Sequence, residues 1–585
     1  MSNKTDPSDL NERLAVIEKI VEEKRKELNV PGAALVIVKD DKVIFLKGFG
    51  LRDVERELPV TTDTLFDVQS VTKPFTALAV MMSVDDGKMS LEDSPKKFLP
   101  FLKFRDSEID ANVTIRDLLC HRTGLANANL TWQTRALNRK EVIQVVALAK
   151  PTARLREQFQ YNNAMYSVAG EALAAANNST YEQVIKNRIF KPLNMKSSNL
   201  SVSELQKSPD FAFGYEFANV PGEVRKFPLY DYSNVAAAGS INSSVKDMAQ
   251  FLRLMLNDGV IDGKRLVSEK NFKEMFTPQI KIGATGYWAL GWASRGTWNG
   301  HRIVFHGGAQ EGFNSIIALM PDQKLGFVLL TNISVSPLAR GVVEDAIWTN
   351  LVGKRESESN SPTSNVSPST DKKTQNSANF NAPISVDELM KKMTDATGGE
   401  ANLRRHKSIV TNVALDYKQQ GITGEGVFHN QSPNLLTRSI TLLALGRKLG
   451  TIYEYFDGAK GGVETSFLPR RVFSGEQLQN LRIASDFHPL LNWKSLFKNV
   501  TIQNISKISG EDAYVVVKTP EKGSQITDYV STKSFLLLRR EVANGESESY
   551  GDYKTVNGMI MPFRIERNVP GIGNIVVTVK NVKFD

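Results

Sequence analysis

The sequence predicts an α+β protein: an antiparallel sheet flanked by helices and carrying a helical subdomain, followed by a second, mostly antiparallel β domain. Strand-like runs lie at both ends of the first ~350 residues and enclose a helical middle. A Ser-, Asn-, Thr- and Pro-rich stretch then interrupts the chain, and strand-like runs alternate with turns beyond it. We therefore expect a first domain at 12–353, a flexible linker at 354–385 and a C-terminal domain at 386–585.

The first domain should begin with a helix and two strands. Apolar residues recur at helical spacing among charged ones over 10–28, and two strand-like runs follow. Three further strand-like runs lie at the other end of the domain. Because strands from both ends need partners, we expect one antiparallel sheet with a helical insertion beside it. The five runs are AALVIVKD, KVIFLKGFG, HRIVFHGG, FNSIIALMP and LGFVLLTN.

The C-terminal domain should open with a short helical stretch at 387–406 and continue as an antiparallel sheet that curves or closes toward a barrel. The phrases ISGEDAYVVVKTP, LLLRRE and YGDYKTVNGMIMPFRIE loosely resemble LolA-like lipoprotein carriers. That resemblance implies an apolar concavity and an apolar ligand; the alternative is a sheet that packs against the first domain. No catalytic constellation is evident in this half of the chain.

Composition excludes several classes of protein. With 41% hydrophobic and 23% charged residues, the 585-residue chain has the make-up of a soluble globular protein. The net charge of +9 is small for this length, so no nucleic-acid partner is implied. Cys120 is the single cysteine, which excludes an intrachain disulfide and a multi-cysteine metal site. No run approaches the roughly 18 apolar residues of a transmembrane segment, so we expect a soluble chain.

Ser70 and Lys73 form the first candidate catalytic pair. Pro74 is best tolerated in the first turn of a helix, so a helix should start near Ser70 and carry Lys73 one turn on, on the same face. A serine hydroxyl needs a base, and a lysine amine can serve once its pKa is lowered by burial or charge. The same S-x-x-K spelling at Ser94 and Ser243 is better explained by helix caps.

Two later elements carry side chains suited to acyl transfer. Tyr161 and Asn163 stand just before another helical run, where a phenol can relay protons and a carboxamide can hold a substrate carbonyl. A strand further on is expected to end in His306, Gly307 and Gly308. Glycines at a strand edge let a substrate backbone approach closely and leave main-chain N–H groups free to donate.

In this order and spacing, the three elements resemble the serine beta-lactamase and penicillin-binding protein superfamily, particularly its class C-like branch of D-aminopeptidases, D-peptidases and family VIII esterases. The stretches TIRDLLCHRTGL and AAAGSINSSVKDMAQFLRLML resemble connecting segments of that branch. The likeness covers about 14–352. It implies a periplasmic or secreted protein whose targeting segment was removed, although a cytoplasmic chain is the alternative.

The resemblance implies a role for each candidate residue. Ser70 would be the acylated nucleophile and Lys73 its proton acceptor, and Tyr161 would share proton transfer and activate the deacylating water. Which of Lys73 and Tyr161 is the general base stays open. The substrate-binding groups implied in the same way are Asn163, His306, Gly307 and Gly308, and the oxyanion hole would be formed by the backbone N–H groups of Ser70 and Ala309.

The sequence departs from the family pattern in three places. Tyr232-Ser233-Asn234 is a second Y-x-N, but its position beside the AAAGS turn favours Tyr161 as the family's tyrosine. Leu155-Arg156 replaces a usual Pro-Gly ahead of that tyrosine. His306 stands where beta-lactamases usually carry the lysine of K-T-G, and an imidazole with an ordinary pKa near ~6.5 is mostly neutral and attracts a substrate carboxylate weakly.

These observations predict a serine hydrolase that acts through an acyl-enzyme on small-molecule esters, amides or peptides, as a carboxylesterase, D-aminopeptidase or D-peptidase, with at most weak beta-lactamase activity. No metal or organic cofactor is expected, because H-E-x-x-H is missing and the histidines are scattered. A penicillin-sensing module with negligible turnover and a true class C-like beta-lactamase are the alternatives.

His121 is expected in a turn, and Trp288, Trp292 and Trp298 either pack in the core or form an aromatic wall for an acyl group.

Overall fold

The computed structural model describes residues 7–218, 222–355 and 382–585. Most of the predicted linker, 356–381, lies outside these residues. The described chain forms two compact units. Unit 1 comprises 7–126, 138–218 and 222–355, and unit 2 comprises 127–137 and 382–585.

Unit 1 is built on one antiparallel sheet. Its strands are β1 (Gly32–Lys39), β2 (Lys42–Asp53), β3 (Leu58–Pro59), β10 (Ile280–Ile282), β11 (Gly286–Trp288), β12 (Ala293–Trp298), β13 (His301–Gln310), β14 (Phe313–Met320) and β15 (Leu325–Thr331). Among the described residues they follow the order β10-β11-β12-β13-β14-β15-β1-β2-β3. Because β1 pairs with β15 from Ala33 opposite Thr331 to Lys39 opposite Leu325, the two ends of the unit meet in one sheet, as the sequence predicts.

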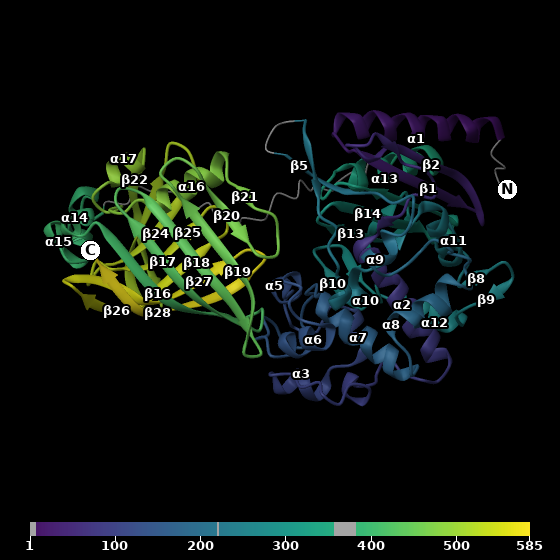
Figure 1. Cartoon of the computed structure of the whole chain (residues 1–585), viewed down its shortest axis with the longest axis horizontal. Coiled ribbons are helices and arrows are strands. Elements are labelled where there is room, and N and C mark those ends of the chain that lie inside the picture. The colour runs from purple at the N-terminus through teal and green to yellow at the C-terminus, as the bar shows by residue number, and fades with distance from the viewer. Residues whose placement is uncertain (1–6, 219–221, 356–381) are drawn as a thin grey trace. The chain divides into compact units, whose positions relative to one another are not determined.

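Helices cover both faces of this sheet. The helices of unit 1 are α1 (Pro7–Glu27), α2 (Thr72–Asp85), α3 (Ser107–Asn112), α4 (Ile115–Leu119), α6 (Arg139–Ala147), α7 (Asn163–Ala176), α8 (Tyr181–Ile185), α9 (Val202–Leu205), α10 (Ala236–Gly239), α11 (Val245–Leu256), α12 (Glu269–Glu274) and α13 (Val343–Leu351). On one face, Ile17 of α1 and Trp348 of α13 pack on Phe327 of β15 in a continuous apolar core. On the other face, α11 lies against β1 and β15 (Figure 1).

The helical middle of the chain forms the subdomain that the sequence predicts. Its helices α3, α6, α7 and α8 gather away from α1 (Figure 1). Local caps fix where the helices start: the Thr114 side chain and Asp117 form a capping box at α4, and Asn162 accepts the N–H of Met165 at the start of α7. Tyr161 therefore lies immediately before α7, and Asn163 is its first residue.

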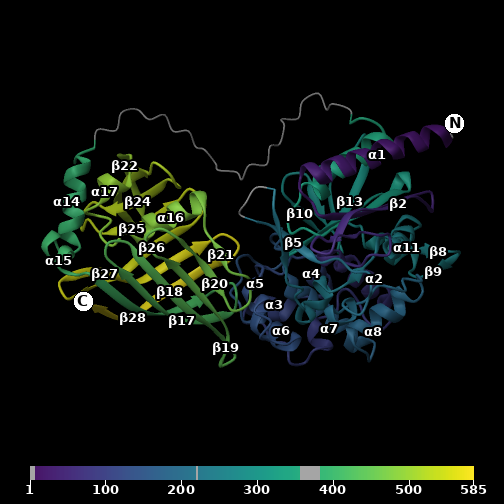
Figure 2. The same cartoon turned by 45° about the horizontal axis from the view of Figure 1, so that its top comes forward.

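Unit 2 is a strongly curved antiparallel sheet (Figure 2), which confirms the predicted fold class of the C-terminal half. Its strands are β16 (Ser408–Tyr417), β17 (Ile422–Gln431), β18 (Leu435–Ala444), β19 (Arg447–Phe456), β20 (Gly461–Thr465), β21 (Arg471–Val472), β22 (Asn499–Ile508), β23 (Glu511–Thr519), β24 (Ile526–Ser531), β25 (Leu537–Val542), β26 (Ser547–Val556), β27 (Met559–Val569) and β28 (Gly573–Phe584). Within the described range their order is β21-β20-β19-β18-β17-β16-β28-β27-β26-β25-β24-β23-β22. Neighbouring strands are antiparallel throughout, so β16 and β28 join the two halves of unit 2 into one sheet.

Helices close parts of this sheet. The helices of unit 2 are α5 (Asn129–Gln133), α14 (Val386–Ala396), α15 (Glu400–Arg405), α16 (Gly475–Ser485) and α17 (Trp493–Leu496). Leu389 and Met393 of α14 pack on Val516 and Val530, and α16 places Leu481 against the sheet. Residues 127–137 belong to this unit because the Leu130 N–H and the Thr131 hydroxyl donate to buried Gln420, at 3.1 and 2.6 Å.

Charged residues form a row across four strands of unit 2. Asp528 of β24 lies opposite Arg540 of β25, Arg540 opposite Glu548 of β26, and Glu548 opposite Arg567 of β27. The signs alternate along the row, so each charge faces opposite charges. Asp528 is fully buried and accepts from Arg540 at 2.7 Å and from Lys518 at 2.7 Å.

Across the described ranges, each helix is too short or too polar to cross a lipid bilayer.

Candidate active site

Ser70 lies in a tight turn directly before α2. This 3₁₀ turn, η1 (Gln69–Val71), leads into α2 at Thr72. Gln69 has a φ of 54°, in the left-handed region that a residue with a side chain seldom adopts. The Asp67 carboxyl holds it there by accepting the Gln69 backbone N–H at 2.8 Å and the Gln69 side-chain amide at 2.6 Å.

Lys73 is buried one turn after Ser70, as the sequence predicts. Its Nζ lies 3.0 Å from Ser70 Oγ, 2.8 Å from Asn163 Oδ1 and 2.9 Å from the carbonyl oxygen of Ala238. The rings of Tyr161 and Tyr166 lie 4.6 and 5.3 Å from the same nitrogen. Burial lowers the pKa of Lys73 well below its ordinary value, because a charged amine loses its hydration there. The structure therefore joins Ser70, Lys73, Tyr161 and Asn163 in one place.

The glycine-edged strand passes beside the Ser70 turn. A Cβ atom on Gly308 would lie 2.6 Å from the carbonyl oxygen of Val68 and 2.8 Å from Cβ of Gln69, so only glycine fits. The Ser315 hydroxyl, on β14, ties the two segments by donating to the same Val68 oxygen at 2.7 Å. β13 thus runs in contact with the residues that precede Ser70.

The predicted end of this strand is wrong by two residues. β13 continues to Gln310, because Ala309 and Gln310 still pair with β14. On the other side, pairing with β12 stops at Phe305. A strand edge beyond such a point can offer backbone N–H and C=O groups to an extended ligand.

Aromatic side chains form a wall beside these groups. The ring of buried His306 lies 5.2 Å from Trp288 and 6.5 Å from Tyr161, and Trp288 lies 5.7 Å from Tyr161. His121 closes the cluster with its ring 4.2 Å from Tyr161. The Asn162 backbone N–H donates to His121 Nδ1 at 3.1 Å, which positions the residue next to Tyr161. Burial, with the charges of Lys73 and His306, lowers the pKa of His121 and favours its neutral form.

The sequence model of the beta-lactamase family matches residues 17–348, more than half of the chain. The chain belongs to the beta-lactamase family. The match ends before unit 2 begins its sheet, so the resemblance of the C-terminal part to LolA-like carriers stays a prediction.

Two curated relatives match the beta-lactamase part of the chain. Protein flp of Staphylococcus aureus (strain N315) is 28% identical over 330 residues, which cover 55% of this chain and 64% of that protein. Unguisins hydrolase ungD' of Aspergillus campestris is 28% identical over 329 residues, 53% of this chain and 60% of that protein. The chain thus spans less than two thirds of the length of either relative.

Two solved structures share the fold. The octameric penicillin-binding protein homologue from Pyrococcus abyssi has a TM-score of 0.53 and 24% identity, over 79% of this chain and 100% of that chain. EstCE1, described as a hydrolase with promiscuous acyltransferase activity, has a TM-score of 0.50 and 18% identity, over 58% of this chain and 99% of that chain. Together with the family match, these structures confirm the beta-lactamase-like fold of unit 1.

The departures from the family pattern have clear places in the structure. In the second Y-x-N, the Tyr232 hydroxyl donates to Glu311 at 2.6 Å. The amide oxygen that Lys73 contacts belongs to Asn163, which favours the Tyr161 element. Arg156, where the family usually has glycine, has a φ of 67° and pairs with buried Asp117 at 2.8 Å. Arg156 thus adopts a left-handed backbone conformation of the kind that glycine adopts most readily.

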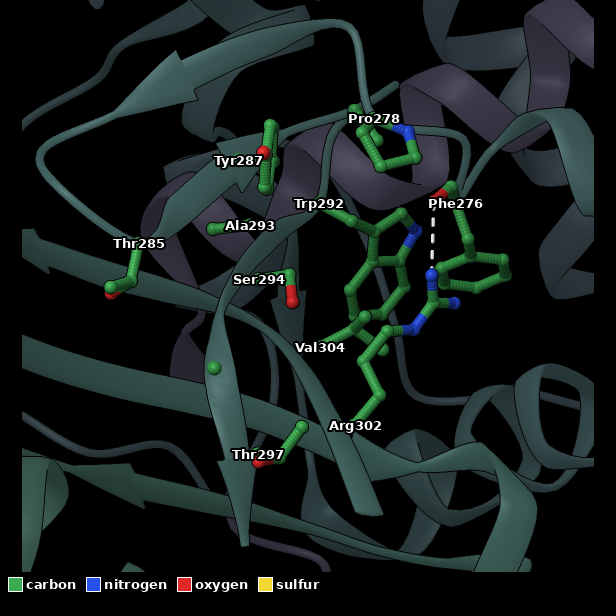
Figure 3. Close-up of a pocket in the computed structure, with 12 residues that line it drawn as sticks. Phe276, Pro278, Thr285, Tyr287, Trp292, Ala293, Ser294, Thr297, Arg302 and Val304 are labelled. Carbon is green, nitrogen blue, oxygen red and sulfur yellow. Dashed lines mark hydrogen bonds between the residues drawn. The ribbon is translucent and has the colours of Figure 1, made fainter. Parts of the chain in front are cut away.

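A recess lies on the same face of β13 as His306. Figure 3 shows Trp292, Phe276 and Arg302 converging on it, and its volume is about 270 Å³. Arg302, Val304 and His306 alternate with residues of the opposite face, so they project to one side of the strand. Of the three tryptophans considered, Trp288 lines the site and Trp292 lines this recess. Trp298 packs in the core on the opposite face and donates from Nε1 to the Gly353 carbonyl at 2.9 Å.

Three functional contacts escape the sequence reasoning. The Ala238 carbonyl that holds Lys73 lies in the AAAGS turn, which has no side-chain signal for this role. Asp67 lies three residues before Ser70. Burial raises the pKa of its carboxyl to about 8; the hydrogen bond from the Gln69 N–H acts in the opposite direction, and the negative charge of Glu311 adds to the increase. His121 is in a turn as expected, with a φ of 55°, but it also forms part of the aromatic wall.

Across the residues that the structure covers, no set of three or more His, Cys, Asp or Glu side chains is arranged to hold a metal ion.

Proposed function

We propose that the protein is a serine hydrolase in which Ser70 is acylated by an ester or an amide and water then releases the acid. One observation supports this most strongly: Ser70 Oγ lies 3.0 Å from an amine that is buried and bonded to two further acceptors. The relative ungD', which carries the name of a hydrolase, supports the same reaction class.

The contacts of Lys73 explain how it would act as a base. Its lowered pKa favours a neutral amine, which has two N–H bonds and one lone pair. Asn163 Oδ1 and the Ala238 carbonyl are acceptors, so they take the two N–H groups. The lone pair then faces Ser70 Oγ and accepts its hydrogen.

The acylation step follows from this arrangement. As the bond from Ser70 Oγ to the substrate carbonyl carbon forms, the hydroxyl proton passes to Lys73 Nζ. The carbonyl oxygen becomes an oxyanion, which we assign to the backbone N–H groups of Ser70 and Ala309. When the tetrahedral intermediate collapses, the bond to the leaving group breaks and that group takes the proton, with Tyr161 as the relay. Water then attacks the acyl group by the reverse path.

The other residues would bind the substrate. Because Asn163 Oδ1 faces Lys73, we assign its Nδ2 group to the substrate carbonyl side. Gly308 lets the substrate backbone lie against β13, and the edge of β13 beyond the end of its pairing with β12 would offer main-chain groups to the substrate. Trp288 and the recess beside Trp292 suit an apolar acyl or leaving group.

His306 bears on the choice among substrates. An imidazole, with an ordinary pKa of ~6.5, attracts the carboxylate of a beta-lactam less than the lysine of K-T-G does. Esters and amides of small or D-configured acyl groups are therefore the proposed substrates, ahead of beta-lactams. A sensor that acylates but does not turn over is the second candidate, because its acylation step would need the same Ser70 and Lys73 contacts.

The test uses a panel of p-nitrophenyl esters of increasing acyl length, D-amino-acid p-nitroanilides and nitrocefin. We expect turnover of at least one ester or anilide that Ser70→Ala removes. Ser94→Ala is the matched control, because Ser94 has the same S-x-x-K spacing but caps a short helical turn by accepting the Lys96 N–H. A long-lived adduct with a beta-lactam and no turnover of any substrate would favour the sensor; full activity of Ser70→Ala would exclude both.

The compartment and the role of unit 2 belong to the same proposal. The likeness to exported penicillin-binding proteins favours a periplasmic or secreted protein. An apolar ligand in the C-terminal half, expected from its loose resemblance to LolA-like carriers, is part of the proposal as well.

A further inference from the structure

Unit 2 contains a recess that is distant in sequence from every candidate catalytic residue. It has a volume of about 170 Å³ and opens between the end of α15 and the strands β16, β17, β27 and β28. Most of its lining is apolar, and the rest is two imidazoles, an amide and a carboxylate. The lining residues are Leu403, His406, Ile409, Asn430, Asp486, Phe487, His488, Met559, Met561 and Phe584.

The two imidazoles carry nitrogens without a protein partner. His406 is 7% exposed, and its Nε2 contacts no donor or acceptor within the described part of the chain. The same holds there for both ring nitrogens of His488. A buried polar atom without a hydrogen bond costs about 1–3 kcal/mol, and such atoms usually face water or a ligand. Contacts with aromatic rings hold both imidazoles in place: His406 lies 4.4 Å from Phe584 in a tilted arrangement, and His488 lies 4.7 Å from Phe487 in an edge-on one.

The polar side chains of the recess can receive a carboxylate through hydrogen bonds. Partial burial lowers the pKa of His488, and the positive charges of Lys407 and Arg404 lower it further. The negative charge of Asp486 acts in the opposite direction. Both oxygens of Asp486 already accept hydrogen bonds: from the Asn492 amide at 3.0 and 3.2 Å, and from the His488 backbone N–H at 2.9 Å. An imidazole N–H can donate to a carboxylate, and Lys407 is a cation close enough to act on His488. Arg404 already pairs with Glu400 at 2.7 Å.

From these contacts we propose that the recess binds a small monocarboxylate with an apolar body, of the size of benzoate or hexanoate. The apolar part would lie against Met559, Met561 and Phe584, and the carboxylate would accept from His406 and His488. An apolar cavity of about 150 Å³ accommodates a benzene ring, so the volume here suits one ring or a chain of about six carbons.

Isothermal titration of the full-length chain with benzoate tests this site. For about nine non-hydrogen atoms, we expect a dissociation constant of about 0.05–5 mM. Benzyl alcohol has the same ring without the charge, and it should bind about tenfold more weakly or worse. Loss of one imidazole donor in His406→Phe should weaken benzoate binding by about tenfold.

A filled recess provides the decisive variant. Met561→Trp should abolish benzoate binding, because the larger side chain occupies the cavity. Ile560→Trp is the matched control: Ile560 is the preceding residue of β27, points to the opposite face and does not line the recess. The dissociation constant of Ile560→Trp for benzoate should lie within about twofold of that of the parent chain. Thermal melts check that both variants fold.

Three results would overturn the proposal: no saturable binding up to about 50 mM benzoate, equal affinity for benzyl alcohol, or unchanged binding in Met561→Trp. The last result would place benzoate elsewhere, for instance at Ser70. The experiment needs no catalytic turnover, so its outcome is independent of the proposed hydrolase activity.

Discussion

One added methyl group at Gly308 tests whether β13 forms one wall of the active site. In Gly308→Ala the new Cβ would lie 2.6 Å from the Val68 carbonyl oxygen and 2.8 Å from Cβ of Gln69, and the Ser315 hydroxyl would be closer still. Carbon atoms prefer separations of about 3.5–4.0 Å, so β13 and the Ser70 turn must move apart by about 0.5–1 Å. All of the atoms that would clash with the methyl group are within the site.

The size of the effect follows from that displacement. A misplacement of about 1 Å between catalytic groups costs about 100-fold in rate. We therefore expect kcat/KM for the best ester substrate to fall about 100-fold, equivalent to about 2.7 kcal/mol of transition-state stabilisation. Over-packing of this kind also costs about 1–3 kcal/mol of folding free energy, so the melting temperature of unit 1 should fall by a few degrees.

Steady-state ester hydrolysis by the folded variant, checked by circular dichroism, measures this effect. Gly239→Ala is the control, because its Cβ would lie 3.7 Å from the nearest Gln69 atom, an ordinary contact. It should retain activity within about threefold. If folded Gly308→Ala hydrolysed the ester at the parent rate, β13 would not be the strand against which substrate binds.

Two other predictions concern the charges of the molecule. Lys73 must be neutral to accept a proton, and burial lowers its pKa, so kcat/KM should fall as the pH decreases. On the alkaline side, kcat/KM should reach its plateau well below pH ~10.4, where an ordinary lysine titrates. A value of kcat/KM that still rises up to that pH would contradict this prediction. Burial opposes ionisation of Asp528, but Arg540 and Lys518 lower its pKa. Asp528→Asn should therefore take from buried Lys518 the carboxylate that it contacts at 2.7 Å, while Arg540 still faces Glu548, and should cost about 3–5 kcal/mol in urea unfolding of unit 2. The half-exposed pair of Asp552 and Lys554 is the control, since Asp552→Asn should cost at most about 1 kcal/mol, and equal effects of the two substitutions would refute the argument.

The sequence predicts those parts of the site that depend on local spacing. Ser70 and Lys73 are three residues apart at a helix start, so helical geometry alone places them on one face. A single sheet built from both ends of the first domain also follows, because strand-like runs at both ends need partners. These features require no knowledge of the tertiary structure beyond the fold class.

Contacts made by the backbone of distant segments could not be predicted in this way. The Ala238 carbonyl bonds Lys73 across 165 residues of chain, and a carbonyl group is the same in every residue. The φ of 54° at Gln69 depends on the Asp67 carboxyl and on packing against β13. Neither contact changes the composition or the periodicity of the sequence.

Irregular strands and inserted segments limit the prediction as well. The register of β12 against β13 shifts between Ser294 and Thr297, so the face on which Trp298 lies cannot be counted from Trp288 or Trp292. Residues 127–137 lie inside the helical middle of the sequence, yet they group with unit 2 through Gln420. Amino-acid composition can indicate where a domain ends along the chain, but it does not indicate that a short segment inside one domain groups with another.

Peptide mapping after rapid acid quench is the most direct test of the catalytic mechanism. The protein is mixed with a p-nitrophenyl ester that it hydrolyses, quenched within one turnover, digested and analysed by mass spectrometry. We predict one acyl group on the peptide that contains Ser70, and none in Ser70→Ala. An acyl group on another residue, or the same adduct and turnover in Ser70→Ala, would contradict a mechanism through Ser70.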